Sequence, residues 1–379
     1  MYLGLQLHIP FCGSRYSCCG QFKEPCEPAP EKRFYEALRI ETQLVAQQYR
    51  KINAEISTIY VRGGTPSLTS LDLFADWLGQ LRSLFHVPDG IEFSLELDPE
   101  CVDLELLAKL MELGVNRPVF GIRSFDRNLL QLLGCKHQPD DSHRTVYLAN
   151  ALGCDSFGID FLFGLPGQGG KMLSADLDHL LDLDPPHISF RQFTVDNGTA
   201  LQKRVDSGAI SMPDDVLTMA LYRGGAARLV EAGYVRYEIS SFAKEGCECR
   251  HSLSHWGGND HLALGPSGHS FILGQYLANT RSVIEYIESL MRRKRPLVVD
   301  EPAREQRMTE AIYDGLRTAR GIDRRRFAER FGQPLEDRLD RNQYDMFIRS
   351  GHLIPDRGNL RLSDEGILLA DEITRRLVK

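Results

Sequence analysis

Residues 57–85, STIYVRGGTPSLTSLDLFADWLGQLRSLF, contain the pattern of one strand, one turn and one helix in succession. The opening run STIYV is rich in β-branched and aromatic residues, which favours a buried strand. The turn RGGTPS follows it. Apolar residues then recur on one face of a helix, at Leu73, Trp77, Leu81 and Leu84. The stretch therefore predicts a βα unit whose turn lies at the carboxyl end of the strand.

The same alternation of strand and helix occurs along the first two thirds of the chain. Six strand-like runs, each followed by a helical pattern, are found at residues 5–9, 57–61, 91–97, 117–122, 157–165 and 187–195. Parallel neighbours need crossover helices between them, so this alternation indicates a parallel sheet. Because six units are fewer than the eight of a closed barrel, we expect a partial (β/α)6 TIM-like barrel, with an open doubly wound sheet as the alternative.

The unusual residues of these units fall in the turns after the strands. They form the segments PFCGSRYSCC, RGGTPS, ELDPE, GIRSF, GLPGQ and VDNGT. Barrels and open parallel sheets both build their sites at the carboxyl ends of strands. The sequence therefore predicts one pocket that is formed by six converging turns.

The chain divides into three parts by its patterning. Residues 1–235 carry the βα units. Residues 236–299 are rich in Gly, His and Ser before a connecting helix, which is typical of a functional loop or lid, and we interpret the basic run Arg292–Arg295 as a solvated helix end. Residues 300–379 combine helices with the strand-like NLRLS, which suggests a small winged-helix-like domain. That fold alone does not assign DNA binding.

The composition limits the partners and the compartment. Of the 379 residues 42% are hydrophobic, and the net charge of −7 gives no signal for nucleic acid. The N-terminus lacks the basic region of a signal peptide, and nowhere do about 18 apolar residues occur in a row. We therefore expect a cytoplasmic protein. In that reducing compartment the nine cysteines are expected to be thiols or metal ligands.

Three of these cysteines, Cys12, Cys18 and Cys19, fall in one turn. Thiolates bind iron–sulfur clusters and also zinc. The spacing leaves both kinds of site open, together with the possibility of thiols that hold no metal.

Other residues of the turns each have a functional and a structural interpretation. Gly63 and Gly64, with Thr65 as a donor, either allow a ligand to approach the backbone closely or form only a tight connection. Glu96 and Asp160 lie at strand ends in apolar runs. They suit either ribose hydroxyls or ordinary capping and ion pairing.

The segment HSLSHWGGNDH, residues 251–261, gathers histidines and a tryptophan. Imidazoles suit haem iron and an indole suits a flat macrocycle, whereas a glycine-rich surface loop explains the same residues equally well. His137 and His187 lie elsewhere and are expected to be structural.

Nine segments spread over the chain resemble the oxygen-independent coproporphyrinogen III oxidase group of radical S-adenosylmethionine (SAM) proteins. They are LHIPFC, GGTPSL, VNR, GIRSFD, IDFLFGLPGQ, HISF, YEISSFAK, CRH and LRLSDEGILLADEI. The chain is most similar to the short branch, the haem chaperones called HemW, because the cysteine turn begins at residue 12. In addition, Gln21 stands where the oxidases have a further cysteine.

The resemblance implies a barrel that holds a [4Fe-4S] cluster on three cysteines, with SAM chelated to the fourth iron. In this chain Cys12 and Cys19 match the outer ligand positions of the family's cysteine motif, and Cys18 is the candidate for the third metal ligand. It assigns SAM to Gly63, Gly64, Thr65, Glu96, Arg123 and Asp160. It assigns haem to His251, His255 and Trp256.

The chain departs from the family pattern around the cluster and SAM. Tyr16 occupies the position of the middle cysteine, and Cys18 stands where an aromatic residue is usual. Arginines replace a glycine, a glutamine and a tyrosine of the SAM pocket, at Arg62, Arg123 and Arg191.

We therefore expect these three arginines to enter the SAM pocket and to pair with Glu96 and Asp160. A buried carboxylate without a partner is costly, and a guanidinium fork satisfies it. SAM then competes with arginine side chains. The alternative is that the arginines point outward and the pocket still works.

The preferred interpretation is a cytoplasmic, haem-chaperone-like protein with weak or absent radical chemistry. It binds haem and transfers it to acceptor proteins, with respiratory proteins among the candidates. Two alternatives stay open: a radical SAM enzyme that acts on a porphyrinogen or on haem, if Cys18 serves as a ligand, and a cluster-free binding protein. Whether the chain is an enzyme is therefore open, as are a homodimer and peripheral membrane association through an acceptor.

Overall fold

The computed structural model describes residues 1–13, 24, 25 and 27–379, so Tyr16, Cys18, Cys19 and Gln21 lie outside the described residues. Six parallel strands follow one another across the sheet. They are β1 (Tyr2–Ile9), β4 (Glu55–Gly63), β5 (Glu92–Leu97), β6 (Arg117–Arg123), β7 (Gly158–Phe163) and β8 (His187–Gln192). The predicted partial (β/α)6 barrel is confirmed.

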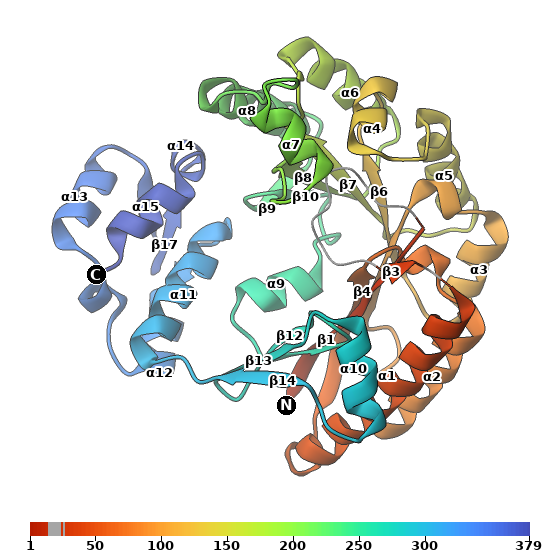
Figure 1. Cartoon of the computed structure of the whole chain (residues 1–379). Coiled ribbons are helices and arrows are strands. Elements are labelled where there is room, and N and C mark those ends of the chain that lie inside the picture. The colour runs from red at the N-terminus through yellow and green to blue at the C-terminus, as the bar shows by residue number, and fades with distance from the viewer. Residues whose placement is uncertain (14–23, 26) are drawn as a thin grey trace.

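Helices cover the outer face of this curved sheet (Figure 1). They are α1 (Pro28–Tyr49), α2 (Leu71–Leu84), α3 (Leu104–Glu112), α4 (Arg127–Leu133), α5 (Pro139–Ala151), α6 (Gly170–Asp182) and α8 (Asp215–Glu231). The short α7 (Ala200–Asp206) follows β8, and its Leu201 belongs to a separate apolar cluster with Leu129 and Leu133 of α4. Short elements lie in the connections: β2 (Phe11–Cys12), β3 (Glu24–Pro25), η1 (Arg50–Ile52), η2 (Pro66–Leu68) and η3 (Pro99–Cys101). Of the helices described, none has the length and apolar character needed to cross a lipid bilayer.

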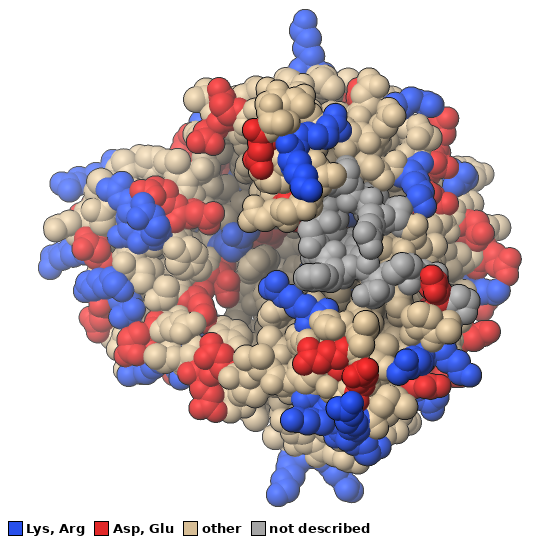
Figure 2. Space-filling model, in the orientation of Figure 1, with Lys and Arg blue, Asp and Glu red and all other residues tan. Residues whose placement is uncertain are grey.

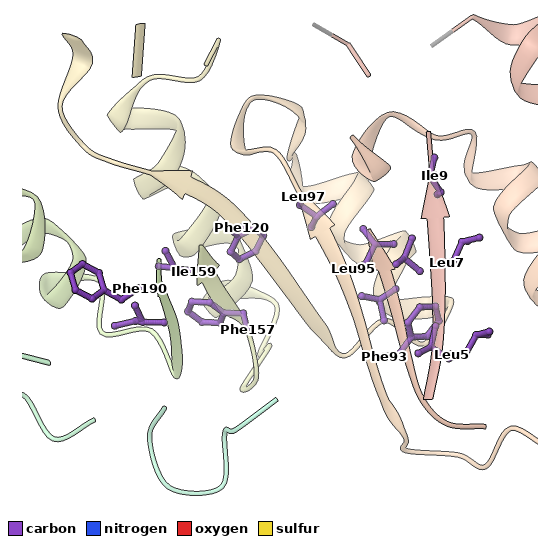
Figure 3. Close-up of a cluster of buried hydrophobic side chains, with 14 of the residues drawn as sticks. Leu5, Leu7, Ile9, Phe93, Leu95, Leu97, Phe120, Phe157, Ile159 and Phe190 are labelled. Atoms are coloured by element: carbon purple, nitrogen blue, oxygen red, sulfur yellow. The ribbon is translucent and has the colours of Figure 1, made fainter. Parts of the chain in front are cut away.

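The main core lies between the sheet and these helices, because apolar side chains alternate along each strand. Figure 3 shows Leu5, Leu7 and Ile9 of β1 and Phe93 and Leu95 of β5, two strands that flank β4, and all five residues are at most 2% exposed. The residues between them point to the opposite face, which lines the inside of the barrel. This alternation places the polar residues of the strands inside the barrel.

The buried face of α2 differs slightly from the expected one. Trp77 and Leu81 are fully buried as predicted, and Phe74 and Leu78 complete the face. Leu84 is 40% exposed, because it is the last residue of the helix and the chain leaves the sheet there. The helical spacing was therefore correct, whereas the face was rotated by about one residue.

Residues 236–299 are not the loop or lid that the sequence suggested. On one edge, β9 (Val235–Glu238) and β10 (Ser241–Ala243) extend the barrel sheet. On the other edge lie β11 (His261–Leu264), β12 (His269–Ile272), β13 (Gln275–Asn279) and β14 (Leu297–Asp300), and the helices are α9 (Arg250–Trp256) and α10 (Val283–Met291). These strands are at most five residues long and are separated by glycines, so they carry little periodic signal.

The basic run after α10 is also not fully solvated. Arg295 is 7% exposed and its Nη2 lies 3.3 Å from Glu41 Oε1, and Glu41 itself is completely buried. The two residues are 254 positions apart, so local charge counting could not pair them. The earlier interpretation of Arg292–Arg295 as a solvated helix end is therefore wrong for Arg295.

The C-terminal part follows the order of a winged helix. It contains α11 (Arg304–Arg317), β15 (Ile322–Asp323), α12 (Arg324–Phe331), η4 (Leu335–Arg338), α13 (Arg341–Arg349), β16 (Leu353–Asp356), β17 (Asn359–Leu362), α14 (Asp364–Ile367) and α15 (Ala370–Leu377). Its three strands form a small sheet beside the barrel (Figure 1). Ion pairs join it to the barrel, from Arg236 to Asp364 at 2.5 Å and from Arg223 to Glu365 at 2.8 Å.

Candidate functional site

A cavity opens at the mouth of the barrel, at the carboxyl ends of the strands. Its volume is about 200 Å³, and its lining comes from the ends of β4, β5, β6 and β7 and the turns after them. All six residues that the resemblance assigned to SAM line it: Gly63, Gly64, Thr65, Glu96, Arg123 and Asp160. The structure therefore brings these residues together, and their role toward SAM stays a prediction.

The two glycines at the end of β4 are required by the backbone of the chain itself. Gly63 has a φ of 127°, which favours glycine, and a Cβ at this residue would lie 2.5 Å from the carbonyl oxygen of Ile9. A Cβ on Gly64 would collide with the carbonyl group of Phe11. The amides of Gly64 and Thr65 donate to these two carbonyl oxygens, both at 2.7 Å. The glycines thus let β4 lie against the start of the cysteine turn.

Asp160 on β7 lies between two guanidinium groups. Arg191 Nη2 donates to Asp160 Oδ2 at 2.6 Å, and Arg123 Nη1 donates to the same oxygen at 3.2 Å. The Asp160 side chain is 7% exposed, against 30% for Arg123 and 42% for Arg191. Burial raises the pKa of Asp160, but Arg191 and Arg123 outweigh burial and lower the pKa to about 2. The predicted pairing of Asp160 with arginine is confirmed.

Arg62 and Glu96 form a looser pair at the same mouth. Arg62 Nε lies 3.9 Å from Glu96 Oε1, and Tyr60 OH donates to that oxygen at 3.4 Å. The Arg62 side chain is 45% exposed, so water screens this pair. With this contact, all three arginines approach the carboxylates of the mouth, and the alternative that they point outward is wrong.

Arg123 reaches Asp160 from an unusual backbone conformation. Its φ is 70°, in the left-handed region that residues other than glycine seldom adopt. The register of β6 against β7 shifts between Phe120 and Arg123, and such a bulge redirects a side chain. Gly121 makes room for the side chain, since a Cβ there would lie 3.1 Å from Arg123 Nη2. The guanidinium group therefore folds back over Gly121 into the barrel.

Cys12 is the one predicted cluster ligand that the structure describes. Its side chain is 7% exposed, and Thr65 Oγ1 lies 3.7 Å from its Sγ. Cys18 and Cys19 lie outside the described residues. Among the side chains that are described, no three of His, Cys, Asp or Glu are arranged to hold a metal ion. The metal role of Cys12 therefore stays a prediction.

Helix α9 is attached to the inside of the sheet near the amino ends of the strands. Glu92, the first residue of β5, is 4% exposed and accepts hydrogen bonds from the amides of Arg250 and His251 at 2.7 and 2.9 Å. A carboxylate at this end also complements the helix dipole. His251 Nδ1 lies 2.8 Å from Thr58 Oγ1, and its ring contacts that of Tyr60. These contacts fix α9 on the face of the sheet opposite α1 and α2 (Figure 1).

The three predicted haem residues have different surroundings. His251 is committed to the barrel, where burial lowers its pKa to about 3, with further lowering by His255 and His261. His255 is exposed, and its ring centroid lies 4.6 Å from that of His261 and 5.4 Å from that of Trp256. The structure therefore brings His255 and Trp256 together and leaves His251 as a structural residue.

Trp256 lines a second cavity, of about 680 Å³, between α9 and the C-terminal domain. Its indole ring also stacks on the guanidinium group of Arg317, 4.9 Å away. Figure 2 shows the surface hollowed between the C-terminal domain and the barrel. Four aromatic side chains line the cavity: Tyr237, Trp256, Phe327 and Phe331.

The structural roles that were expected for two other histidines are confirmed. His137 is 1% exposed, and its Nε2 lies 2.9 Å from the carbonyl oxygen of Ile122. His187 is 3% exposed, and its Nε2 lies 2.8 Å from Tyr237 OH. Burial lowers the pKa of both rings.

Sequence reasoning missed Glu92, which positions α9. The signal was present, because Glu92 and Glu96 are four residues apart in one apolar run and hence share a face of the strand. Only Glu96 was singled out, since it lies at the carboxyl end where sites are built. The partner amides of Glu92 are 158 and 159 positions away and carry no local pattern.

Two family models match the chain. Residues 8–180 match the radical SAM superfamily, and residues 303–369 match the HemN C-terminal domain. The solved structure of coproporphyrinogen III oxidase (HemN) from Escherichia coli, a radical SAM enzyme, covers 98% of this chain and 89% of its own, with a TM-score of 0.87. At 21% sequence identity this likeness concerns the fold alone.

Several curated relatives cover most of the chain. Heme chaperone HemW from Bacillus subtilis is 28% identical over 97% of both chains. Heme chaperone HemW from Escherichia coli is 30% identical over 74% of both chains. The mitochondrial radical S-adenosyl methionine domain-containing protein 1 from Bos taurus is 30% identical over 99% of this chain and 87% of its own.

Proposed function

Because the chain belongs to the HemW family of haem chaperones within the radical SAM superfamily, we propose that it binds haem and passes it to acceptor proteins. The observation that carries the proposal is the last turn of α9. There the exposed imidazole of His255 stands beside Trp256, which lines the larger cavity. We further propose that this happens in the cytoplasm.

The larger cavity has the chemistry that a haem needs. Its volume of about 680 Å³ lies within the range of about 300–1,000 Å³ that is usual for small-molecule sites. Its aromatic walls suit a flat apolar macrocycle. Arginines on the C-terminal side of the lining, Arg320, Arg326 and Arg330, suit the two propionates of haem, because guanidinium groups bind carboxylates in a bidentate manner.

The two imidazoles of α9 are not equivalent as iron ligands. His251 uses Nδ1 on Thr58 and packs on Tyr60 inside the barrel. His255 is exposed at the end of the helix, next to the aromatic wall. We therefore assign the axial ligand to His255, with His251 as a residue that positions α9.

The family also implies a [4Fe-4S] cluster and SAM. The buried thiol of Cys12, at the carboxyl end of the first barrel strand, fits a cluster ligand, and we propose that Cys18 and Cys19 complete the set. When bound, such a cluster supplies one-electron redox chemistry. Cys12 contributes a thiolate to it, and Thr65 provides a hydroxyl beside that sulfur.

The test is a titration of the full-length protein with haemin, followed by the Soret absorbance. His255→Ala is expected to lower haem affinity at least tenfold and to shift the Soret maximum, because it removes the iron ligand. Trp256→Ala is expected to lower affinity without that shift, because it removes only packing.

His269→Ala is the matched control, since His269 is an exposed histidine on the neighbouring strand β12. It is expected to bind haem like the wild type. If His255→Ala and His269→Ala bind haem equally well and with the same spectrum, His255 is not the ligand. Release of bound haem to apomyoglobin, measured in the same samples, tests the transfer step.

A further inference from the structure

The mouth of the barrel contains side chains that differ from the family pattern. Arg62, Arg123 and Arg191 stand where the resemblance expects a glycine, a glutamine and a tyrosine. Each of the three replacements adds a long cationic side chain to the site. All three approach Glu96 or Asp160, as the distances above show.

The space that remains is small. The cavity at the mouth measures about 200 Å³, below the range of about 300–1,000 Å³ that is usual for small-molecule sites. Arg123 lines it directly, and the bulge in β6 directs this side chain into the barrel. Of the three arginines, Arg123 is therefore the one that takes up space in this cavity.

The charges are also unfavourable for SAM, whose sulphonium and ammonium groups outweigh its one carboxylate and leave it with a net positive charge. Both Arg123 and Arg191 donate to one oxygen of Asp160, and Ser189 also hydrogen-bonds to this carboxylate. Asp160 is thus already engaged by the chain itself. Like charges within a few ångströms repel one another strongly where water is partly excluded.

We propose that Arg62, Arg123 and Arg191 take the place of SAM at the barrel mouth, so that this chain does not use SAM as a ligand. The two carboxylates of the mouth hold arginines of the chain itself. Haem binding at α9 then proceeds without SAM. The inference stands on the geometry of the mouth and is independent of the haem proposal.

The experiment is isothermal titration of SAM into the anaerobically reconstituted full-length protein. The test variant combines Arg62→Gly, Arg123→Gln and Arg191→Tyr, which restores the residues of the family pattern. The matched control combines Arg39→Gln, Arg127→Gln and Arg204→Gln, which removes the same charge at three exposed arginines. The wild type and the control are expected to bind SAM at least tenfold more weakly than the test variant.

Two results overturn the proposal: a wild type that binds SAM as tightly as the test variant, or a folded test variant that binds no better than the control. Circular dichroism establishes folding, and Arg191→Tyr alone, expected to give a smaller gain, replaces the triple variant if that one does not fold. Haemin titration of the same samples keeps the two proposals apart. If the wild type does not bind haem but the SAM titrations give the expected results, the haem proposal is refuted and this one is not.

Discussion

Glu41, in the wall of the barrel, and Asp160, at its mouth, are both buried carboxylates that pair with arginine. Glu41 on α1 is completely buried. It accepts hydrogen bonds from Gly265 N at 3.0 Å, Asn279 Nδ2 at 2.8 Å, Tyr286 OH at 2.7 Å and Arg295 Nη2 at 3.3 Å. Asp160 is nearly as buried, but its two arginines are 30% and 42% exposed beside a cavity.

The difference between these pairs is the access of water to the arginines. Removing Glu41 leaves the largely buried Arg295, 7% exposed, without its carboxylate partner. Removing Asp160 leaves guanidinium groups that water still reaches. The same kind of ion pair therefore lies in a buried wall in one place and beside a water-accessible cavity in the other.

The largest effect is expected for Glu41→Gln. Because this change leaves a buried guanidinium without its charge partner, we expect the free energy of unfolding to fall by about 3–5 kcal/mol. Urea denaturation measures this loss. Glu36→Gln, at an exposed position of the same helix, is the control and is expected to change it by less than about 0.5 kcal/mol. Equal stabilities of the two variants would contradict the structural role of Glu41.

Asp160→Asn is expected to cost less, about 1–3 kcal/mol near neutral pH. The pKa of Asp160 is lowered from 3.8 to about 2, so its charge stabilises the folded state above pH 3.8. This contribution is lost as the pH falls from 3.8 to about 2. The difference in stability between the wild type and the variant should therefore shrink over that interval. Urea denaturation at pH 7, 4 and 3 measures it, and a constant difference would argue against the lowered pKa.

The smallest effect is expected for Arg62→Gln. Its contact with Glu96 spans 3.9 Å and the arginine is 45% exposed, so the free energy of unfolding should change by less than about 0.5 kcal/mol. Thermal unfolding measures it, with Arg295→Gln as the opposite case. A loss as large as that of Arg295→Gln would show that the mouth and the wall do not differ as described.

The pairing of arginines with carboxylates at the mouth could be predicted from the sequence. Each of these residues lies near the carboxyl end of a strand in a βα pattern, and parallel strands bring such positions to one end of the barrel. The confirmed contacts of Arg62, Arg123 and Arg191 follow from that rule. The resemblance was also needed, because it identified the positions of the three arginines as positions of the SAM pocket.

Other contacts could not be predicted, because they depend on strands too short to show a period. The haem segment was expected as a loop, whereas β11 pairs in parallel with β1 and α9 sits inside the barrel. The partners of Glu92 and of Arg295 follow from this arrangement. A local sequence pattern therefore could not predict on which side of α9 His255 and Trp256 lie either.

The position of α9 has a consequence for the C-terminal domain. This seven-residue helix separates the barrel interior from the larger cavity, and Glu92 holds its first amides. The helix contacts β1 and β4 of the barrel and also α11 of the C-terminal domain. Under the haem proposal, the stacking of Trp256 on Arg317 would therefore couple the position of the C-terminal domain to the wall of the binding cavity.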